Sequence, residues 1–369
     1  MKARLNRDVD DVSSKHMKFS AGDRDAIRSA LVRWYRRTAR PLPWRKNRDP
    51  YAIWVSEVML QQTQVATVIP YYERFLEAFP TLADLARAPL ERVLQLWSGL
   101  GYYRRARHLH QAARELVRRF AGAFPQDYNQ IRSLPGIGDY TARAILSIAF
   151  GLPFTLLDGN VARVLSRLAA LEGNLHQPRF RRAVEAHLQP LLAPRSPGDF
   201  NQALMELGQT LCLPRAPQCT ACPVRSWCRG CQSGQPHLYP QPRPRRAAES
   251  HYLAAAILRC GPRVAMVRGL ADGLLDDLWN FPSAFGRSHA QALASLRGKL
   301  AGFKSPSLNL RDSAAEIHHG ITYRSIRVHA YTAEIPHPPR QNGFRWFAIS
   351  SLPEAAISQL ARKIARQVL

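Results

Sequence analysis

Four cysteines within a span of seventeen residues constrain this chain more than any other sequence feature. They are Cys212, Cys219, Cys222 and Cys228, spaced C-x6-C-x2-C-x5-C. Four thiolates so close together can bind a structural zinc ion or an iron–sulfur cluster. Zinc sites more often show two C-x2-C pairs or added histidines, so the spacing favours iron–sulfur and leaves zinc as the alternative. Cys260 is most simply a small buried residue, and Cys231 has no assigned role.

The chain's size and charge limit its class and its partners. Its 369 residues suffice for two or three domains, and its formal net charge is +25. Basic residues run through the whole chain, which favours nucleic acid as partner, then an anionic membrane, over a merely solvated surface. No apolar run approaches the roughly 20 residues of a membrane span, and the polar N-terminus lacks a signal-peptide core. We expect a cytoplasmic protein, nucleoid-associated if bacterial, where structural disulfides are rare.

Changes of periodicity along the chain predict its domains. Residues 1–21 are expected to be a mobile tail, and 22–232 an all-α domain, because apolar residues recur at helical spacing, as across 54–79. The Pro- and Arg-rich stretch 233–250 is interpreted as a linker. Residues 251–369 combine alternating strand patterns with one helical pattern. The predicted fold class is a multidomain protein, an all-α domain followed by a smaller α/β domain.

The segment "LPGIGDYTARAILSIAF", residues 134–150, carries the first motif with a chemical meaning. Gly136 and Gly138 flank Ile137 just before a predicted helix. Glycines allow positive φ and close backbone approach, and the free N–H groups at a helix start suit a phosphate. The segment is therefore interpreted as a helix-hairpin-helix that grips a DNA backbone. A lone G-x-G is more often an ordinary tight turn, but the surrounding residues strengthen the DNA interpretation.

Two carboxylates are candidates for catalysis. Asp158, in "LLDGNVARVLSRL", stands at a predicted helix start, where an isolated Asp is more often a simple N-cap. Glu57 lies among apolar neighbours in "WVSEVMLQQTQV". It is either turned to solvent or held in a cavity with a raised pKa, ready to donate a proton. Its own surroundings in the sequence do not decide between the two.

Taken together, these motifs resemble the helix-hairpin-helix DNA glycosylase superfamily with a 4Fe-4S cluster. Within it the chain resembles the adenine DNA glycosylases, the MutY family, through segments spread over the whole helical part. They are "PLPWR" (41–45), "DPYAIWVSEVMLQQTQV" (49–65), "GLGYYRRARHLH" (99–110), "LDGNVARVLSR" (157–167) and "NQALMELGQTLC" (201–212).

The resemblance implies a base-excision-repair enzyme that flips adenine, mispaired with 8-oxoguanine or guanine, out of double-stranded DNA and hydrolyses its N-glycosidic bond. Glu57 matches the general acid that protonates adenine N7. Asp158 matches the carboxylate that stabilises positive charge at the sugar, a division of labour like that in glycoside hydrolases. Asn160 matches a residue that hydrogen-bonds near the reacting centre.

Further residues take roles from the same resemblance. Bifunctional relatives carry Lys at the position of Tyr140, and a phenol forms no Schiff base, so a monofunctional enzyme that leaves an abasic site is expected. Gln61 or Gln62 matches the segment that wedges into the duplex. The four cysteines are expected to hold a structural 4Fe-4S cluster that shapes a phosphate-contacting loop. The remaining expected DNA contacts are Tyr102, Gly136, Gly138, Arg215 and Arg225. A monomer is a family expectation.

The C-terminal part resembles the family's Nudix-like domain, which recognises 8-oxoguanine. The helical pattern at 289–303 contains no Glu, so pyrophosphate hydrolysis is not expected. Ile321, Thr322 and Tyr323 align with the Phe-Ser-His loop that reads the modified base. Tyr replaces the His, and we expect weaker discrimination of 8-oxoguanine from guanine, or other reading residues. An alternative register places His318 and His319 at the loop.

Two rival functions follow from the same residues. One is a glycosylase of the same superfamily that acts on thymine or oxidised pyrimidines. Glu57 argues against it, since protonation of purine N7 needs an acid there. The other is a non-catalytic iron–sulfur DNA-binding protein or redox sensor. The presence of both Glu57 and Asp158 argues against it, because a pure binder needs neither.

Overall fold

The computed structural model describes residues 19–242, 247–270, 275, 278–301, 308–321, 323–336 and 343–369. Contacts within the chain divide it into two compact units, Met1–Gln62 with Glu115–Pro244, and Thr63–Arg114 with Arg245–Leu369. Residues 63–114 thus group with the C-terminal part rather than with the rest of the predicted helical domain.

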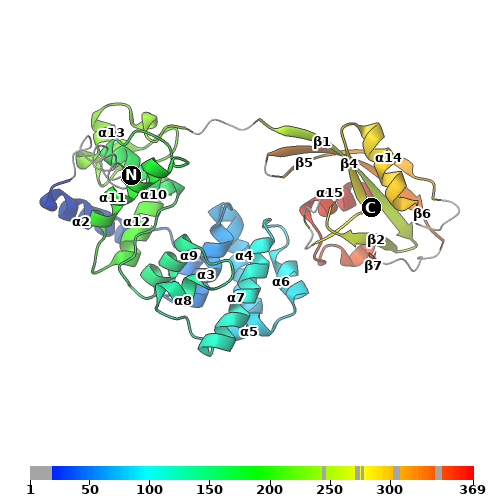
Figure 1. The fold of residues 1–369 in the computed structure, drawn as a ribbon, viewed down its shortest axis with the longest axis horizontal. Coiled ribbons are helices and arrows are strands. Elements are labelled where there is room, and N and C mark those ends of the chain that lie inside the picture. Colours follow the sequence, from blue (N-terminus) through cyan, green and yellow to red (C-terminus); the bar gives the residue numbers. More distant parts are fainter. Residues whose placement is uncertain are drawn as a thin grey trace, which may run out of the picture. The chain divides into compact units, whose positions relative to one another are not determined.

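The first unit is helical wherever it has regular structure in its described residues (Figure 1). Its longer elements are α2 (Ala21–Thr38), α3 (Pro50–Leu60), α8 (Tyr128–Arg132), α9 (Asp139–Ala144), a π-helical turn (Ile145–Ala149), α10 (Gly159–Ala169), α11 (Pro178–Leu188), α12 (Pro197–Thr210) and α13 (Arg229–Gln232). The 3-10 turns are η1 (Pro43–Arg45), η3 (Gln189–Leu191), η4 (Cys219–Ala221), η5 (Arg225–Trp227) and η6 (Pro236–Leu238).

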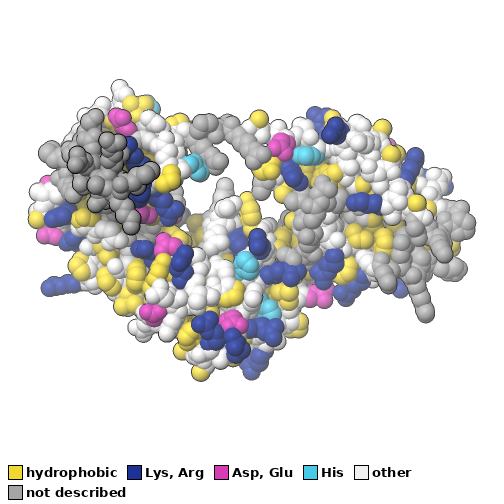
Figure 2. Space-filling model, in the orientation of Figure 1, with side chains coloured by type: hydrophobic (Ala, Val, Ile, Leu, Met, Phe, Trp, Pro, Cys, Tyr) yellow, Lys and Arg dark blue, Asp and Glu magenta, His cyan; other side chains and the backbone are white. Residues whose placement is uncertain are grey.

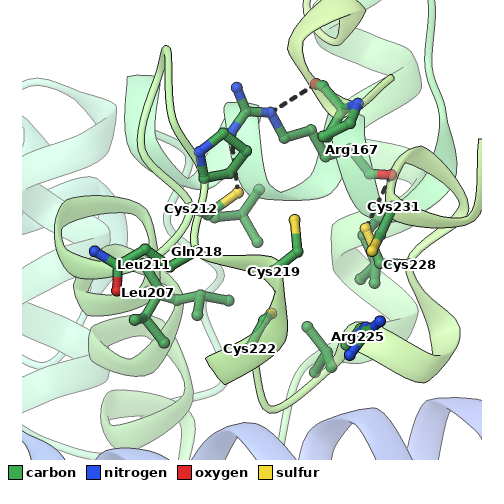
Figure 3. Close-up of a pocket in the computed structure, with 15 residues that line it drawn as sticks. Arg167, Leu207, Leu211, Cys212, Gln218, Cys219, Cys222, Arg225, Cys228 and Cys231 are labelled. Carbon is green, nitrogen blue, oxygen red and sulfur yellow. Dashed lines mark hydrogen bonds between the residues drawn. The ribbon is translucent and has the colours of Figure 1, made fainter. Parts of the chain in front are cut away.

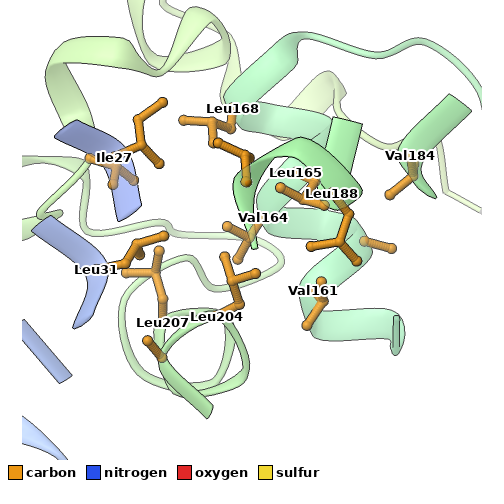
Figure 4. Packing of buried hydrophobic residues seen from close by; sticks show 14 of the residues in the cluster. Ile27, Leu31, Val161, Val164, Leu165, Leu168, Val184, Leu188, Leu204 and Leu207 are labelled. Carbon is orange, nitrogen blue, oxygen red and sulfur yellow. The ribbon is translucent and has the colours of Figure 1, made fainter. Parts of the chain in front are cut away.

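A hydrophobic core formed by α2, α10, α11 and α12 supports the functional residues of this unit. Figure 4 shows Ile27 and Leu31 of α2 facing the apolar side chains of α10 and α12. Val161 and Val164, at helical spacing on α10, belong to the same core. The start of α10, where Asp158 lies, is therefore held by packing rather than by a free loop.

The second unit contains both helices and a sheet. Its helices are α4 (Val65–Ala78), α5 (Leu82–Arg87), α6 (Leu90–Trp97), the first part of α7 (Arg104–Phe120), α14 (His289–Leu300) and α15 (Gln359–Val368), with one 3-10 turn, η8 (Ile349–Ser351). Its strands are β1 (Glu249–Cys260), β2 (Arg263–Arg268), β3 (Trp279–Asn280), β4 (Ser283–Gly286), β5 (Arg311–Ile321), β6 (Arg324–Glu334) and β7 (Phe344–Ala348).

One sheet joins all of these strands. Its main path runs β3-β2-β1-β6-β5, and β4 pairs with β1 while β7 pairs with β2. The β1–β6 pair is parallel, with Leu253 opposite Val328, and the other pairs are antiparallel. Alternate residues of β1 face two different cores, one shared with α14 and one with α15. The predicted fold class, an all-α part followed by a smaller α/β domain, is confirmed.

The apolar pattern across 54–79 belongs to two helices, because α3 ends at Leu60 and α4 begins at Val65. Gln62, between them, has φ +58°, which no α-helix accommodates. One local prediction was wrong. The alternative register for the C-terminal hairpin fails, because His318 and His319 pair with Arg327 and Ile326 inside the β5–β6 ladder.

Candidate active site

Glu57 lies on α3, a helix buried along almost its whole length. The Asp49 side chain caps this helix by accepting hydrogen bonds from the backbone N–H groups of Tyr51 and Ala52, and Pro50 occupies the first turn. Glu57 itself is only 8% exposed. Burial, opposed in part by a hydrogen bond from Tyr140, raises the pKa of Glu57 from 4.5 to about 7. Of the two interpretations, the buried carboxylic acid with a raised pKa fits this position of Glu57. The carboxylate turned to solvent does not.

Asp158 is the N-cap of α10 and also acts on Glu57. Its Oδ1 accepts a hydrogen bond from Val161 N at 2.7 Å, and its Oδ2 accepts one from Asn160 Nδ2 at 3.0 Å. The capping interpretation is therefore correct. Capping does not exclude a catalytic role for Asp158, because its negative charge acts on both Glu57 and Tyr140 and raises their pKa values.

Tyr140, on α9, completes this group of side chains. Burial, together with the charges of Glu57 and Asp158, raises the pKa of Tyr140 well above 10. The phenol therefore stays protonated, able to donate a hydrogen bond to Glu57, and its oxygen lies 3.2 Å from Met205 Sδ. Three side chains from three helices, α3, α9 and α10, are thus brought together, and no amine stands at position 140.

A buried ion-pair network near Glu57 was not predicted from the sequence. Glu206 on α12 is 1% exposed and accepts hydrogen bonds from Arg40 (2.6 Å) and Arg45 (2.9 Å). Burial by itself would raise the pKa of Glu206, but these two arginines lower it to about 2. Arg45 also acts electrostatically on Glu57. Arg45 belongs to "PLPWR" and Glu206 to "NQALMELGQTLC", two segments that resembled the family without an assigned role.

Arg163 connects the carboxylate site to the cysteine loop, and this residue was also missed. Its Nη2 donates to Asn160 Oδ1 at 2.9 Å and to Gly208 O at 2.7 Å, while its Nε donates to Cys212 O at 2.9 Å. A Cβ on Gly208 would lie 2.7 Å from Asn160 Cβ, so α10 and α12 can approach this closely only at glycine. The only hint in the sequence was a pair of arginines four residues apart on an otherwise apolar helix.

The predicted helix-hairpin-helix is formed by α8, a short loop and α9. Gly136 has φ +72°, so this position needs glycine, whereas Gly138 is the N-cap of α9 with an ordinary φ of −82°. A Cβ on Gly138 would meet no atom within 4 Å, so its outer face is open. Leu134 and Ile137 are buried and anchor the loop. The two glycines therefore differ: the first shapes the turn, and the second leaves the start of α9 uncovered.

The other predicted DNA contacts lie at exposed or partly exposed positions. Gln61 is the C-cap of α3 and has its Nε2 3.4 Å from Thr141 Oγ1, next to Tyr140 in sequence. Gln62 is exposed in the left-handed conformation. Tyr102, in the other unit, has φ +49° and is 47% exposed, unusual for a large aromatic side chain. Arg215 and Arg225 are exposed on the cysteine loop.

The four predicted cysteines face a common pocket (Figure 3). Burial raises the pKa of Cys222 to about 12 and that of Cys228 to about 11, which favours the protonated thiols until a metal binds. Four thiols from one short segment that line one pocket can bind a zinc ion or an iron–sulfur cluster.

Cys231, left unassigned above, lines the same pocket (Figure 3). It lies on α13, the short helix after Cys228, and its thiol makes a hydrogen bond with that of Cys219. Cys228 and Cys231 form a second C-x2-C pair, which the sequence contains but the prediction overlooked. The pocket therefore has five thiols, one more than a cluster with four cysteine ligands needs.

Arg167, also missed, organises the loop that carries these thiols. It is 2% exposed and lies one turn beyond Arg163 on α10. Its guanidinium donates to four backbone carbonyls and lies 3.4 Å from Cys212 Sγ. The accepting carbonyls belong to Leu213 (2.6 Å), Pro214 (2.8 Å), Pro236 (2.9 Å) and Tyr239 (3.0 Å).

The predicted 8-oxoguanine readers lie at the β5–β6 hairpin. Ile321 ends β5 and pairs with Arg324, and the Tyr323 carbonyl accepts a hydrogen bond from Glu249 N at 2.9 Å. Thr322 lies outside the described residues. The role of Ile321, Thr322 and Tyr323 stays a prediction. Separately, no helix in the described ranges is long and apolar enough to cross a membrane.

Comparisons with known proteins agree with this geometry. Residues 55–191 match the model of the HhH-GPD superfamily base excision DNA repair proteins. Over 96% of its length the chain is 36% identical to the adenine DNA glycosylases of Homo sapiens and Mus musculus, covering 76% and 80% of those proteins. The solved structure of a thermostable thymine-DNA glycosylase superimposes with TM-score 0.51 and 26% identity, over 57% of this chain and 98% of that one. The chain therefore belongs to the adenine DNA glycosylase family.

Proposed function

We propose that this chain removes adenine mispaired with 8-oxoguanine or guanine in double-stranded DNA, and that Glu57 and Asp158 carry the reaction. The observation that carries the proposal is the buried Glu57, whose pKa is raised to about 7 beside Tyr140 and within the field of Asp158. An acid with a pKa near the working pH is suited to proton transfer. A nearby ionised carboxylate is suited to a cationic transition state.

The division of roles follows from these environments. Glu57 donates its proton to N7 of the flipped adenine, so that the base leaves neutral as the bond to C1′ breaks. Asp158, with Oδ2 accepting from Asn160, stabilises the developing oxocarbenium ion. Ionised Glu57 then takes a proton from the water that attacks C1′. Base and abasic sugar are the products, and Tyr140 offers no amine for strand cleavage.

Single-turnover assays on defined duplexes test the proposal. We expect adenine release opposite 8-oxoguanine and guanine, with strand breaks appearing only after alkali, because no Schiff base forms at position 140. Thymine opposite guanine serves as the control substrate and should remain intact. Breaks without alkali would contradict the monofunctional reaction. Binding without any base release would favour the non-catalytic alternative.

We also propose that Cys212, Cys219, Cys222 and Cys228 hold a 4Fe-4S cluster that supplies no chemistry to the reaction and shapes a DNA-contacting loop. The C-x6-C-x2-C-x5-C sequence spacing and the pocket that the four thiols share support this choice. Exposed Arg215 and Arg225 on that loop are placed to meet phosphates. Figure 2 shows further Lys and Arg side chains spread over the visible face, as a polyanionic partner requires.

The fifth thiol provides a sharp test of the ligand set. Cys222→Ser is expected to lose the cluster's iron and visible absorbance, since a ligand is removed. Cys231→Ser is its matched control in the same pocket and should keep both, because Cys231 lies outside the four-cysteine pattern. Iron analysis of the two purified variants decides. If Cys231→Ser lost its iron and Cys222→Ser kept it, Cys231 rather than Cys222 would be the ligand.

For the C-terminal domain we propose that Ile321, Thr322 and Tyr323 contact the base opposite adenine. With Tyr at the third position the preference for 8-oxoguanine over guanine is weaker than where a His stands. The ratio of adenine release rates opposite the two bases measures it. A strong preference that is lost in Thr322→Ala would contradict the idea of weakened recognition.

A further inference from the structure

A cluster of two imidazoles and one carboxylate lies in the C-terminal domain, on the β5–β6 hairpin and the adjoining helix α14. His289 is the first residue of α14, Glu316 is on β5 and His329 is on β6. One ligand atom from each lies within 4.8 Å of the other two, and among the described residues no other such group of His, Cys, Asp or Glu occurs. We propose that these three side chains form a binding site for a divalent transition-metal ion of the zinc type.

The sheet register builds two of the three ligands into a rigid frame. Glu316 and His329 are direct partners across the antiparallel β5–β6 ladder, so their side chains emerge on the same face. His329 Nε2 lies 3.9 Å from Glu316 Oε2. This separation is too long for a hydrogen bond and about half an ångström longer than the roughly 3.3–3.4 Å between two tetrahedral ligands bound at about 2.0–2.1 Å. A bound ion would draw the two side chains together by that amount.

The third ligand comes from the helix that covers this face. The rings of His289 and His329 have centroids 3.5 Å apart and are inclined by 70°. Tyr252 on β1 packs edge-on against His289, with centroids 4.6 Å apart, and limits its rotation. An imidazole from α14 and the β5–β6 pair thus converge from two layers of the domain.

An independent observation points to a missing ligand. Nε2 of His329 is buried and has no hydrogen-bond partner among the described residues. Leaving a buried polar atom without a partner is unfavourable, so a ligand at this nitrogen would stabilise the structure. A bound cation would use the lone pair of this nitrogen. Glu316 remains 46% exposed on its side chain, which leaves the site open to an entering ion.

The donor chemistry selects the class of metal. Two imidazole nitrogens and one carboxylate oxygen suit zinc and its first-row neighbours, whereas magnesium and calcium prefer oxygen ligands alone. The surrounding charge is mixed: Asp312 and Glu316 attract a cation, while Arg327 and the positive end of α14 oppose it. Three protein ligands leave further positions to water. The ion would link the start of α14 to strands β5 and β6 of the hairpin.

Calorimetric titration of the cluster-loaded, chelator-washed full chain with zinc tests the proposal. We expect one saturable site per chain that survives excess magnesium. His289→Gln and His329→Gln should each weaken it by more than about a hundredfold, beyond what loss of an outer partner costs. His318→Gln is the matched control, because His318 Nε2 lies 3.6 Å from Glu316 Oε1 but outside the cluster, and it should bind zinc like the wild type.

A second measurement separates this site from the cysteines and from misfolding. Zinc should raise the thermal unfolding midpoint of the wild type and of His318→Gln but not of His289→Gln, while all three unfold alike without zinc. Zinc binding that is unchanged in both His289→Gln and His329→Gln would overturn the proposal, as would the absence of any saturable site. Displacement of zinc by equimolar magnesium would also overturn it.

Discussion

Glu57→Gln lowers the single-turnover rate of adenine release by about 10²–10⁴-fold, because the amide has no proton to give to N7 of the leaving base. In the wild type the rate falls as pH rises through about 7, the pKa of Glu57, since only the protonated acid can act. The residual rate of the variant should lose this dependence. The measurement is the pH profile of both proteins under single-turnover conditions. A variant that keeps the wild-type rate, or a wild type whose rate rises through pH 7, would contradict the role of Glu57.

The same substitution should stabilise the protein at alkaline pH. Burial raises the folded-state pKa of Glu57 from 4.5 to about 7, so the fold favours the protonated form. The associated stability is present below pH 4.5 and is lost as pH rises through 7. The amide side chain of the Glu57→Gln variant is neutral at every pH, so the variant does not lose this stability. Its free energy of unfolding should exceed that of the wild type by about 3 kcal/mol at pH 8 and by about 1 kcal/mol at pH 5. Urea unfolding at the two pH values measures the difference.

Glu77→Gln, which changes an exposed carboxylate on α4, is the matched control for charge removal. It should alter the free energy of unfolding by less than about 0.5 kcal/mol at either pH. An equal gain in the two variants, or a gain for Glu57→Gln that does not grow with pH, would show that Glu57 is ionised freely in the folded protein.

The second large effect is expected for Arg167→Ala. This substitution should lower the free energy of unfolding by about 3–5 kcal/mol and remove most of the bound iron. The substitution leaves two carbonyls at the start of the cysteine segment and two beyond its end without their buried charged donor. It also removes the positive charge beside Cys212. Iron content and the urea unfolding midpoint of the purified protein are the readouts.

Two comparisons make the Arg167 result specific. Arg181→Ala removes an exposed arginine that forms an ion pair with Glu185 on α11, and should cost less than about 1 kcal/mol of stability and no iron. Arg167→Lys keeps the charge but not the fork of planar donors, and should fall between the two. Full iron retention in Arg167→Ala would mean that the cysteine segment orders itself without this residue.

The candidate site illustrates what sequence patterns can and cannot predict. The cysteine spacing was sufficient to predict that the four thiols share a pocket, because all four lie in one short segment. Cys231 was missed because its proximity to Cys219 depends on the turn of α13, which folds the chain back. Arg163 and Arg167 were missed for a similar reason, since the backbone carbonyls to which they donate lie 45 to 72 residues away along the chain.

Glu57 could be located but not interpreted from its neighbours. A helix with one polar face would have shown whether the carboxylate points to solvent, but α3 is buried on all sides over Tyr51–Met59. The state of Glu57 depends on Tyr140, Asp158 and Arg45, which come from three other segments. The sequence pattern also did not show where α3 ends, because apolar residues resume at helical spacing after the non-helical residues 61–64.

The most direct test of the central claim compares wild type and Asp158→Asn in single-turnover release of adenine opposite 8-oxoguanine. The amide can still cap α10 and approach Asn160, so the fold and the cluster should persist. It carries no charge to stabilise the oxocarbenium ion. We predict that alkali-revealed strand breaks fall by at least about 10²-fold while DNA binding is retained. Release at the wild-type rate would contradict the assignment of Asp158, and with it the carboxylate pair at the centre of this account.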